Sequence, residues 1–198
     1  MSTRDGSRHD ILSQGPRAPT DSPRVALPTR TPLYADPAAP RGAAPTAEPI
    51  VDAKARFEAA AEKLRTAVKA NAGLRVLAAS ASPDVFYASN PAISTDLMYF
   101  TELGLNVVVP DKLDTGGYFE SLSWENADKY RAGLILLDNR TIALQPKDLA
   151  AKPGWGALPA VKANQVTPWD TVPRFSYAGS APLLERLAEA VQNAKKVA

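Results

Sequence analysis

The sequence predicts an α/β protein over residues 51–198, a Rossmann-like, mostly parallel sheet with helices on both faces, preceded by a disordered tail over residues 1–50. Two observations carry this prediction. After Val51, short apolar runs alternate with stretches of helical periodicity, and strands separated by helices favour parallel pairing. Before Val51, the chain holds half of its 18 prolines, among Ala, Arg, Thr and Ser.

The proline-rich tail has little apolar surface to bury and cannot donate regular backbone hydrogen bonds, so conformational entropy favours disorder. Three interpretations stay open for it. It is an arm that binds a partner, a passive extension, or the product of a misassigned gene start or reading frame.

The first predicted helix lies within residues 51–72. Its apolar residues recur every three or four positions, which places them on one stripe, and Gly73 supplies a stop signal. The apolar run LRVLAAS (74–80) then predicts a buried strand. The stripe consists of Phe57, Ala61, Leu64 and Val68.

A second helix and strand are predicted next. Ser94 or Asp96 can cap a helix that ends at Gly104. LNVVVP (105–110) predicts a strand, because its β-branched run is closed by a proline. The inner face of the helix carries Leu97, Phe100 and Leu103.

Residues 119–122 are predicted to be extended and to lead into a short helix. Ser123 can cap that helix through its hydroxyl, with Glu125 near the positive end of the helix. GLILLD (133–138) predicts a third apolar strand.

The last third of the chain predicts a helix near residues 147–151, a turn at PGWG, another at LPAVKANQ and a short strand around Val166. A final helix is predicted to begin near Ser180. Its buried face is expected to carry Leu183, Leu184, Leu187 and Val191.

Composition excludes several classes of function. A net charge of +2 gives no bulk drive toward nucleic acid or membrane surfaces. The absence of cysteine, and a single histidine (His9) in the tail, argue against disulfides, metal sites and Ser-His-Asp triads. No apolar run approaches the roughly 18 residues that span a bilayer, and the N-terminus lacks a secretory pattern. We therefore expect no cofactor, no nucleic-acid partner and no direct membrane insertion, and a cytoplasmic location if the chain is expressed as given.

Nucleotide binding and catalysis lack support in the sequence. The segment after residues 74–80 has no glycine, whereas a dinucleotide site needs glycines there so that the backbone can approach the pyrophosphate. Carboxylates are scattered from Asp84 to Asp138 without an acid–base pattern, and Ser80 has no partner at motif spacing. An α/β enzyme acting on a nucleotide or small molecule stays an alternative, as do an interaction protein and a fragment without function.

Aromatic and arginine side chains gather in the segments that follow the predicted strands. Ligands of open α/β sheets bind beyond the carboxyl ends of the strands. Rings together with guanidinium groups suit a bulky, partly apolar, anionic or metal-chelating ligand, although packing in the core is the alternative for each residue. The candidate ligand-binding residues are Tyr87, Trp124, Asn139, Arg140, Trp169, Arg174 and Tyr177, and Phe86, Asn90, Tyr118 and Phe175 lie in the same segments.

The order of these segments resembles a known family. LRVLAAS is followed by DLMYFTELGLNVVVP, YFESLSWENADKYRAGLILLDNR, WGALPAVKANQVTPWD and SYAGSAPLLERLAEAV. In this order they resemble the C-terminal lobe of bacterial ABC-transporter periplasmic substrate-binding proteins of the iron–siderophore/vitamin B12 class. The resemblance covers roughly residues 51–198, which would be that C-lobe.

The resemblance implies non-catalytic capture of a ferric siderophore, or a related iron or tetrapyrrole chelate, for delivery to an ABC permease. It also implies a location in the periplasm or at the outer face of the cell membrane. Trp124, Arg140, Trp169 and Arg174 would lie in ligand-facing segments. Such proteins have a whole lobe where residues 1–50 stand, so we expect a truncated member without an N-lobe, which binds weakly.

Docking to the permease is implied as well. Members of the class engage the permease through an acidic surface residue on each lobe. At the position that matches here, after Gly104, stands Leu105, and Glu102 lies nearby.

Overall fold

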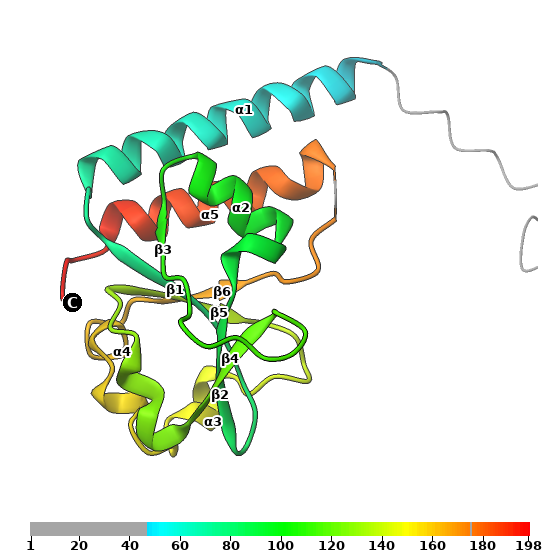
Figure 1. The fold of residues 1–198 in the computed structure, drawn as a ribbon. Coiled ribbons are helices and arrows are strands. Elements are labelled where there is room, and N and C mark those ends of the chain that lie inside the picture. Colours follow the sequence, from blue (N-terminus) through cyan, green and yellow to red (C-terminus); the bar gives the residue numbers. More distant parts are fainter. Residues whose placement is uncertain (1–46, 175) are drawn as a thin grey trace, which may run out of the picture. The chain divides into compact units, whose positions relative to one another are not determined.

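The computed structural model describes residues 47–174 and 176–198, with side chains from Val51 onward. In this part of the chain one sheet has the strand order β4-β2-β1-β5-β6, with β3 also paired to β1 (Figure 1). The strands are β1 (Arg75–Ala81), β2 (Val85–Ser89), β3 (Asn106–Val107), β4 (Phe119–Ser123), β5 (Leu134–Asp138) and β6 (Val166–Trp169). The α-helices are α1 (Ala47–Ala70), α2 (Thr95–Glu102), α3 (Pro146–Leu149), α4 (Pro159–Lys162) and α5 (Tyr177–Asn193), and the 3₁₀ helices are η1 (Pro91–Ile93), η2 (Trp124–Lys129) and η3 (Trp155–Ala157).

The predicted fold class is confirmed. β1 pairs in parallel with β3 and β5, and β5 pairs in parallel with β6. β2 is antiparallel to both β1 and β4, so two antiparallel strands extend the parallel centre of the same sheet on one side. The predicted tail over residues 1–50 lies outside the described residues as far as residue 46, and α1 begins at Ala47.

The hairpin between β1 and β2 was missed, and the predicted strand over residues 105–110 is wrong in length. Ser82 turns the chain, because its backbone N–H donates to the Val85 carbonyl at 2.9 Å and its Oγ accepts from the Val85 N–H at 3.2 Å. β2 then pairs with residues 79–81 of β1, while β3 pairs with residues 75 and 76. β3 is short because β2 occupies the rest of that edge.

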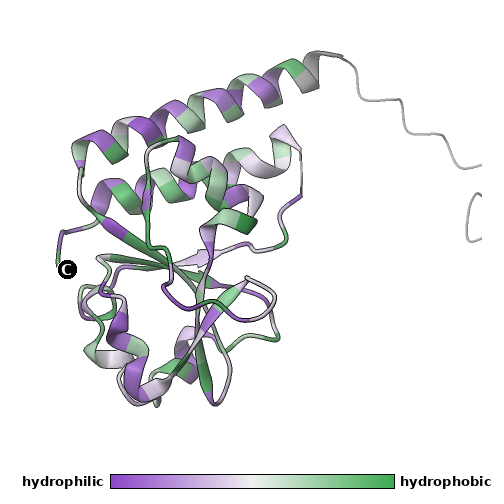
Figure 2. Ribbon diagram, in the orientation of Figure 1, coloured by the Kyte–Doolittle hydropathy of each residue, from purple (hydrophilic) through white to green (hydrophobic). Residues whose placement is uncertain are grey.

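Helices cover both faces of the sheet, as predicted. α1, α2 and α5 pack on one face, where the buried side chains include Leu64, Leu97 and Leu184. η2, α3, η3 and α4 pack on the other face, around Phe86 and Leu149. α1 and α5 run alongside each other in Figure 1, and hydrophobic and hydrophilic residues alternate along both helices in Figure 2.

Helix ends differ from the predictions in three places. α5 begins at Tyr177, three residues before Ser180, because the Ser176 Oγ accepts from the Gly179 N–H at 3.1 Å. Ser123 precedes η2 as predicted, but its hydroxyl accepts from the Asn126 side chain at 3.0 Å and makes no capping bond. Ser94 likewise precedes α2 without a side-chain cap. The predicted stripe of α1 is confirmed, with Ala61 and Leu64 buried and Phe57 and Val68 partly buried.

Candidate ligand-binding site

The parallel strands β1, β5 and β6 all end at one side of the sheet. We call the residues at and just after these strand ends the carboxyl edge; they are Ser80, Asp138, Asn139, Arg140, Trp169, Asp170 and Thr171. The register brings these residues together, because Asp138 lies opposite Trp169 in the β5–β6 ladder. The Asn139 N–H extends this ladder by donating to the Trp169 carbonyl at 3.1 Å. Polar groups from three strands thus share one rim.

Arg140 is held at this edge by the carboxylate of Asp138. Its Nε lies 3.0 and 3.1 Å from the two carboxylate oxygens, and its Nη2 lies 2.7 Å from Oδ2. The Asp138 side chain is fully buried, whereas the Arg140 side chain is 45% exposed. Burial raises the pKa of Asp138, but hydrogen bonds from Arg140 and Ser80 outweigh it and leave this pKa below its ordinary value. The ion pair therefore stays charged and extends from the interior to the surface.

Trp169 and Asn139 connect the edge to its surroundings. The Trp169 indole is buried, and its Nε1 donates to Asp96 Oδ2 in the first turn of α2 at 2.6 Å. The exposed Asn139 donates from Nδ2 to Asp170 Oδ1 at 3.2 Å. Asp170 also lies 3.9 Å from the guanidinium of Arg186 on α5.

Tyr87 lies on the same face of the sheet as the Asp138 carboxylate. It is opposite Ser80 in the β1–β2 ladder, so the two side chains project to one side, and the Ser80 Oγ donates to Asp138 Oδ2 at 2.8 Å. The half-buried Tyr87 ring packs edge-on against Phe119 at 5.7 Å between centroids. Tyr87 therefore borders the edge from the hairpin side.

Of the remaining predicted residues, Trp124 and Tyr177 lie in the two apolar layers instead of at this edge. Trp124 is 5% exposed within the core of the opposite sheet face, where its ring lies 5.6 Å from Phe86 and its Nε1 donates to the Pro83 carbonyl at 3.1 Å. Tyr177 lies in the helix layer, 5.4 Å from the ring of Phe57. Arg174 is exposed in the segment between β6 and α5.

Of the neighbouring residues named with them, Phe86 is a core residue and contacts no solvent. Tyr118 is exposed, and Asn90 is buried, with its side-chain oxygen accepting from the Ala92 N–H. Phe175 lies outside the described residues.

A second polar network holds the segment that leads into β4. The buried Glu120 carboxylate accepts hydrogen bonds from the Lys129 ammonium, the Tyr130 hydroxyl and the Lys112 N–H. The Tyr130 hydroxyl in turn accepts from the Asp111 N–H at 2.6 Å. Burial raises the pKa of Glu120, but these bonds outweigh it and lower the pKa to about 2. The network fixes residues 111–120 against η2.

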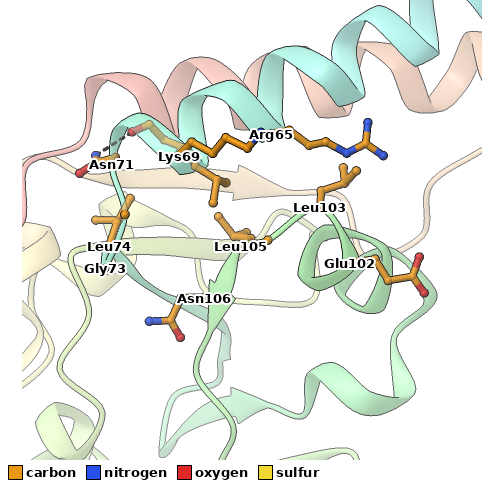
Figure 3. Close-up of a pocket in the computed structure, with 13 residues that line it drawn as sticks. Arg65, Lys69, Asn71, Gly73, Leu74, Glu102, Leu103, Leu105 and Asn106 are labelled. Atoms are coloured by element: carbon orange, nitrogen blue, oxygen red, sulfur yellow. Dashed lines mark hydrogen bonds between the residues drawn. The ribbon is translucent and has the colours of Figure 1, made fainter.

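A hollow of about 390 Å³ lies at the opposite, amino ends of the strands (Figure 3). Arg65 and Lys69 of α1 border it on one side, and Glu102 and Asn106 lie across from them in Figure 3. Glu102 is exposed, whereas Leu105, the position matched to the acidic docking residue, is buried. An acidic docking residue in this region would therefore have to be Glu102 and not the residue at position 105.

The described residues contain no group of three His, Cys, Asp or Glu side chains arranged to hold a metal ion. Nor does any helix in residues 47–174 and 176–198 combine the length and apolarity needed to cross a membrane.

Sequence reasoning missed Asp138, Ser80 and Thr171 as parts of the edge. Asp138 looked like one of many scattered carboxylates, and Ser80 like a serine without a partner. The available signal was position: each of these two polar residues ends a strongly apolar run, LILLD or LRVLAAS, where parallel strands reach a common rim.

Comparison with known proteins agrees with the fold of this lobe. The periplasmic binding protein family matches residues 48–173. DesE, a ferric-siderophore receptor protein from Streptomyces coelicolor, is 52% identical, with a TM-score of 0.74 over 79% of this chain and 53% of its own. No curated protein sequence gives a significant match.

Two more distant structures share the fold. The siderophore periplasmic binding protein from the fuscachelin gene cluster of Thermobifida fusca is 20% identical, with a TM-score of 0.56 over 73% of this chain and 54% of its own. FeuA, the triscatecholate siderophore binding protein of Bacillus subtilis, is 20% identical, with a TM-score of 0.53 over 75% and 54%. This chain thus spans about half the length of these relatives. The match over residues 48–173, together with the identity to DesE, shows that the chain belongs to the periplasmic binding protein family.

Proposed function

We propose that this chain binds a ferric siderophore, or a related iron or tetrapyrrole chelate, without catalysing a reaction, and that it serves an ABC importer. The observation that carries the proposal is the 52% identity to DesE over 79% of the chain. The partners are then the chelate and the permease subunits of the importer. The proposed place of action is the periplasm or the outer face of the cell membrane.

The carboxyl edge supports this proposal chemically. Arg140 and Asn139 present side-chain N–H donors at this edge, and the Tyr87 ring lies on the same sheet face as Asp138. A ferric chelate carries oxygen acceptors on a partly apolar body, which suits this combination. We place Tyr87, Asn139, Arg140, Trp169 and Arg174 at or beside the ligand, and Trp124 and Tyr177 as supports of the adjoining layers.

The β1–β2 hairpin argues against the nucleotide-binding enzyme considered above. A dinucleotide site needs a glycine-rich turn from the first strand into a helix, whose N-terminus receives the phosphates. Here β1 turns at residues 82–84 directly into an antiparallel strand. A thermal-shift screen with nucleotides should therefore leave the melting temperature unchanged.

Calorimetric titration with ferrioxamine B, with ferri-bacillibactin and with haem tests the proposed function. Binding should depend on iron, so the iron-free ligands serve as the first control. Quenching of tryptophan fluorescence provides a second readout, since Trp169 lies at the carboxyl edge.

Arg140→Ala should weaken binding about tenfold, the effect expected from loss of a charge-assisted hydrogen bond. Arg131→Ala is the matched control, because Arg131 is also exposed but precedes β5 at its other end. Absence of heat and quenching with both chelates and haem at high micromolar concentration would contradict the proposal. Equal losses of affinity in the two arginine variants would show that the ligand does not bind at the carboxyl edge.

A further inference from the structure

Asp138 is a buried charge at the end of β5 whose acceptor positions are filled from three elements. Oδ2 accepts from the Ser80 Oγ of β1 at 2.8 Å, and Oδ1 accepts from the Arg140 N–H at 3.0 Å. The Thr171 Oγ1, which follows β6, lies 3.3 Å from Oδ1. A carboxylate bound on so many sides cannot rotate without breaking hydrogen bonds in a buried position, which is costly.

The contacts to Arg140 use one edge of its guanidinium. Nε and Nη2 bond to the carboxylate, so the Nη1 donors, on the opposite side of the planar group, are left for another acceptor. The side chain is 45% exposed, which allows a ligand to reach it. An arginine on a flexible loop would have to lose rotamer freedom when it binds a ligand, whereas this one is already ordered.

We propose that Asp138 is a positioning residue that orients the Arg140 guanidinium toward the ligand, with Ser80 and Thr171 fixing Asp138 in turn. The contact between Arg140 and a ligand rests on the proposed function, whereas the orientation of Arg140 in the free protein does not. Asp138 is fully buried and has no surface with which to contact the ligand itself. Its effect on binding must therefore pass through Arg140.

The orientation is tested without any ligand, by NMR of the Arg140 Nε–H group in the full chain. The resonance is assigned by its loss in Arg140→Lys. In the unmodified protein the proton should exchange slowly with water. In Asp138→Asn its exchange should be at least about tenfold faster, because the charged acceptor is gone. Equal exchange rates in the two proteins would overturn the proposal.

The route of the effect is tested by a double-mutant cycle with ferrioxamine B. Asp138→Asn and Arg140→Ala should each raise Kd about tenfold, and the double variant should be no weaker than Arg140→Ala alone. A full further tenfold loss in the double variant would mean that Asp138 acts elsewhere, and would overturn the proposal. A purely structural role would lower the unfolding free energy without this coupling, so urea unfolding of each variant accompanies the cycle.

Ser80→Ala covers the case in which Asp138→Asn fails to fold. It leaves both partners of the ion pair in place and removes one bond to the carboxylate. It should raise Kd about threefold in the unmodified background and not at all beside Arg140→Ala. If the unmodified chain binds no chelate, the proposed function fails, while the exchange measurement in Ser80→Ala and Asp138→Asn still decides whether Asp138 orients Arg140.

Discussion

At the scale of single residues, Glu120 makes stability depend on pH. Its folded pKa of about 2 lies below the ordinary 4.5, so its contribution is complete above pH 4.5 and is lost as the pH falls toward 2. Glu120→Gln should lower the unfolding free energy at pH 7 by about 2 kcal/mol, because it removes a charged acceptor of three hydrogen bonds. Urea unfolding at pH 7 and pH 3 should show a smaller pH effect in Glu120→Gln than in the unmodified protein.

Asp128→Asn is the control for this measurement, because Asp128 is an exposed carboxylate in the same region. It should leave the pH dependence unchanged. An Asp128→Asn variant that flattens the profile as much as Glu120→Gln does would show that the network around Glu120 is not its source.

Substitutions at two glycines distinguish the cost of backbone strain from the cost of a steric clash. Gly117 and Gly154 both have positive φ, of 74° and 77°, which L side chains rarely adopt. A Cβ on Gly117 meets nothing within 4 Å, whereas one on Gly154 would lie 2.8 Å from the Trp124 carbonyl oxygen. Gly117→Ala should cost about 1 kcal/mol through strain alone, and Gly154→Ala about 1–2 kcal/mol more, in urea unfolding. Equal losses of unfolding free energy in the two variants would mean that the Trp124 backbone shifts to accommodate the new methyl group without a measurable penalty.

The residue types of the carboxyl edge could be predicted from the sequence, but their partners could not. Arg140 and Asn139 follow an apolar strand, and that position alone suggests exposure at a rim. Whether an aromatic ring reaches the same rim depends on which sheet face it occupies. Trp124 and Phe86 project to one face and Tyr87 to the other, although Phe86 and Tyr87 are adjacent in sequence. This alternation follows once β2 is recognised as a strand, and β2 was missed.

At the scale of elements, strand positions were predictable and strand pairing was not. The apolar runs located β1 and β5, because a central strand buries both faces. β3 and β2 compete for the same edge of β1, so the length of one depends on where the chain returns for the other. The outcome depends on the pairing of Arg75 in β1 with Asn106 in β3, and local sequence patterns do not indicate pairing over such a separation.

The hydrogen bond from the Trp169 indole to Asp96 connects the end of β6 to α2, and we expect it to stabilise the fold. Trp169→Phe keeps most of the buried ring but removes the donor to Asp96, and should lower the unfolding free energy by about 1–2 kcal/mol. In a cycle with Asp96→Ala, the two losses should be coupled by about 1 kcal/mol. Strictly additive losses would show that the short indole contact adds nothing to packing.

At the scale of the whole molecule, the described lobe has two apolar layers that share one sheet. β1 and β5 supply neighbouring residues to both: Val76 and Leu136 face the layer of α1 and α5, while Leu77 and Ile135 face the layer of η2 and α3. Since neither layer can lose the sheet without exposing the other, we expect the lobe to unfold as one cooperative unit.

Leu64→Ala and Leu149→Ala test this expectation from opposite faces. Both side chains are fully buried, so each truncation should lower the unfolding free energy by about 2–4 kcal/mol. Because the two sites share no contacts, the losses should add in the double variant to within about 0.5 kcal/mol. Circular dichroism follows mainly the long helices α1 and α5, and fluorescence follows mainly Trp124 and Trp155 on the other face, so coincident transitions in each variant indicate a single unit. A Leu149→Ala protein whose fluorescence transition moves to lower urea while its helical signal stays in place would instead show that the η2–α3 layer unfolds independently.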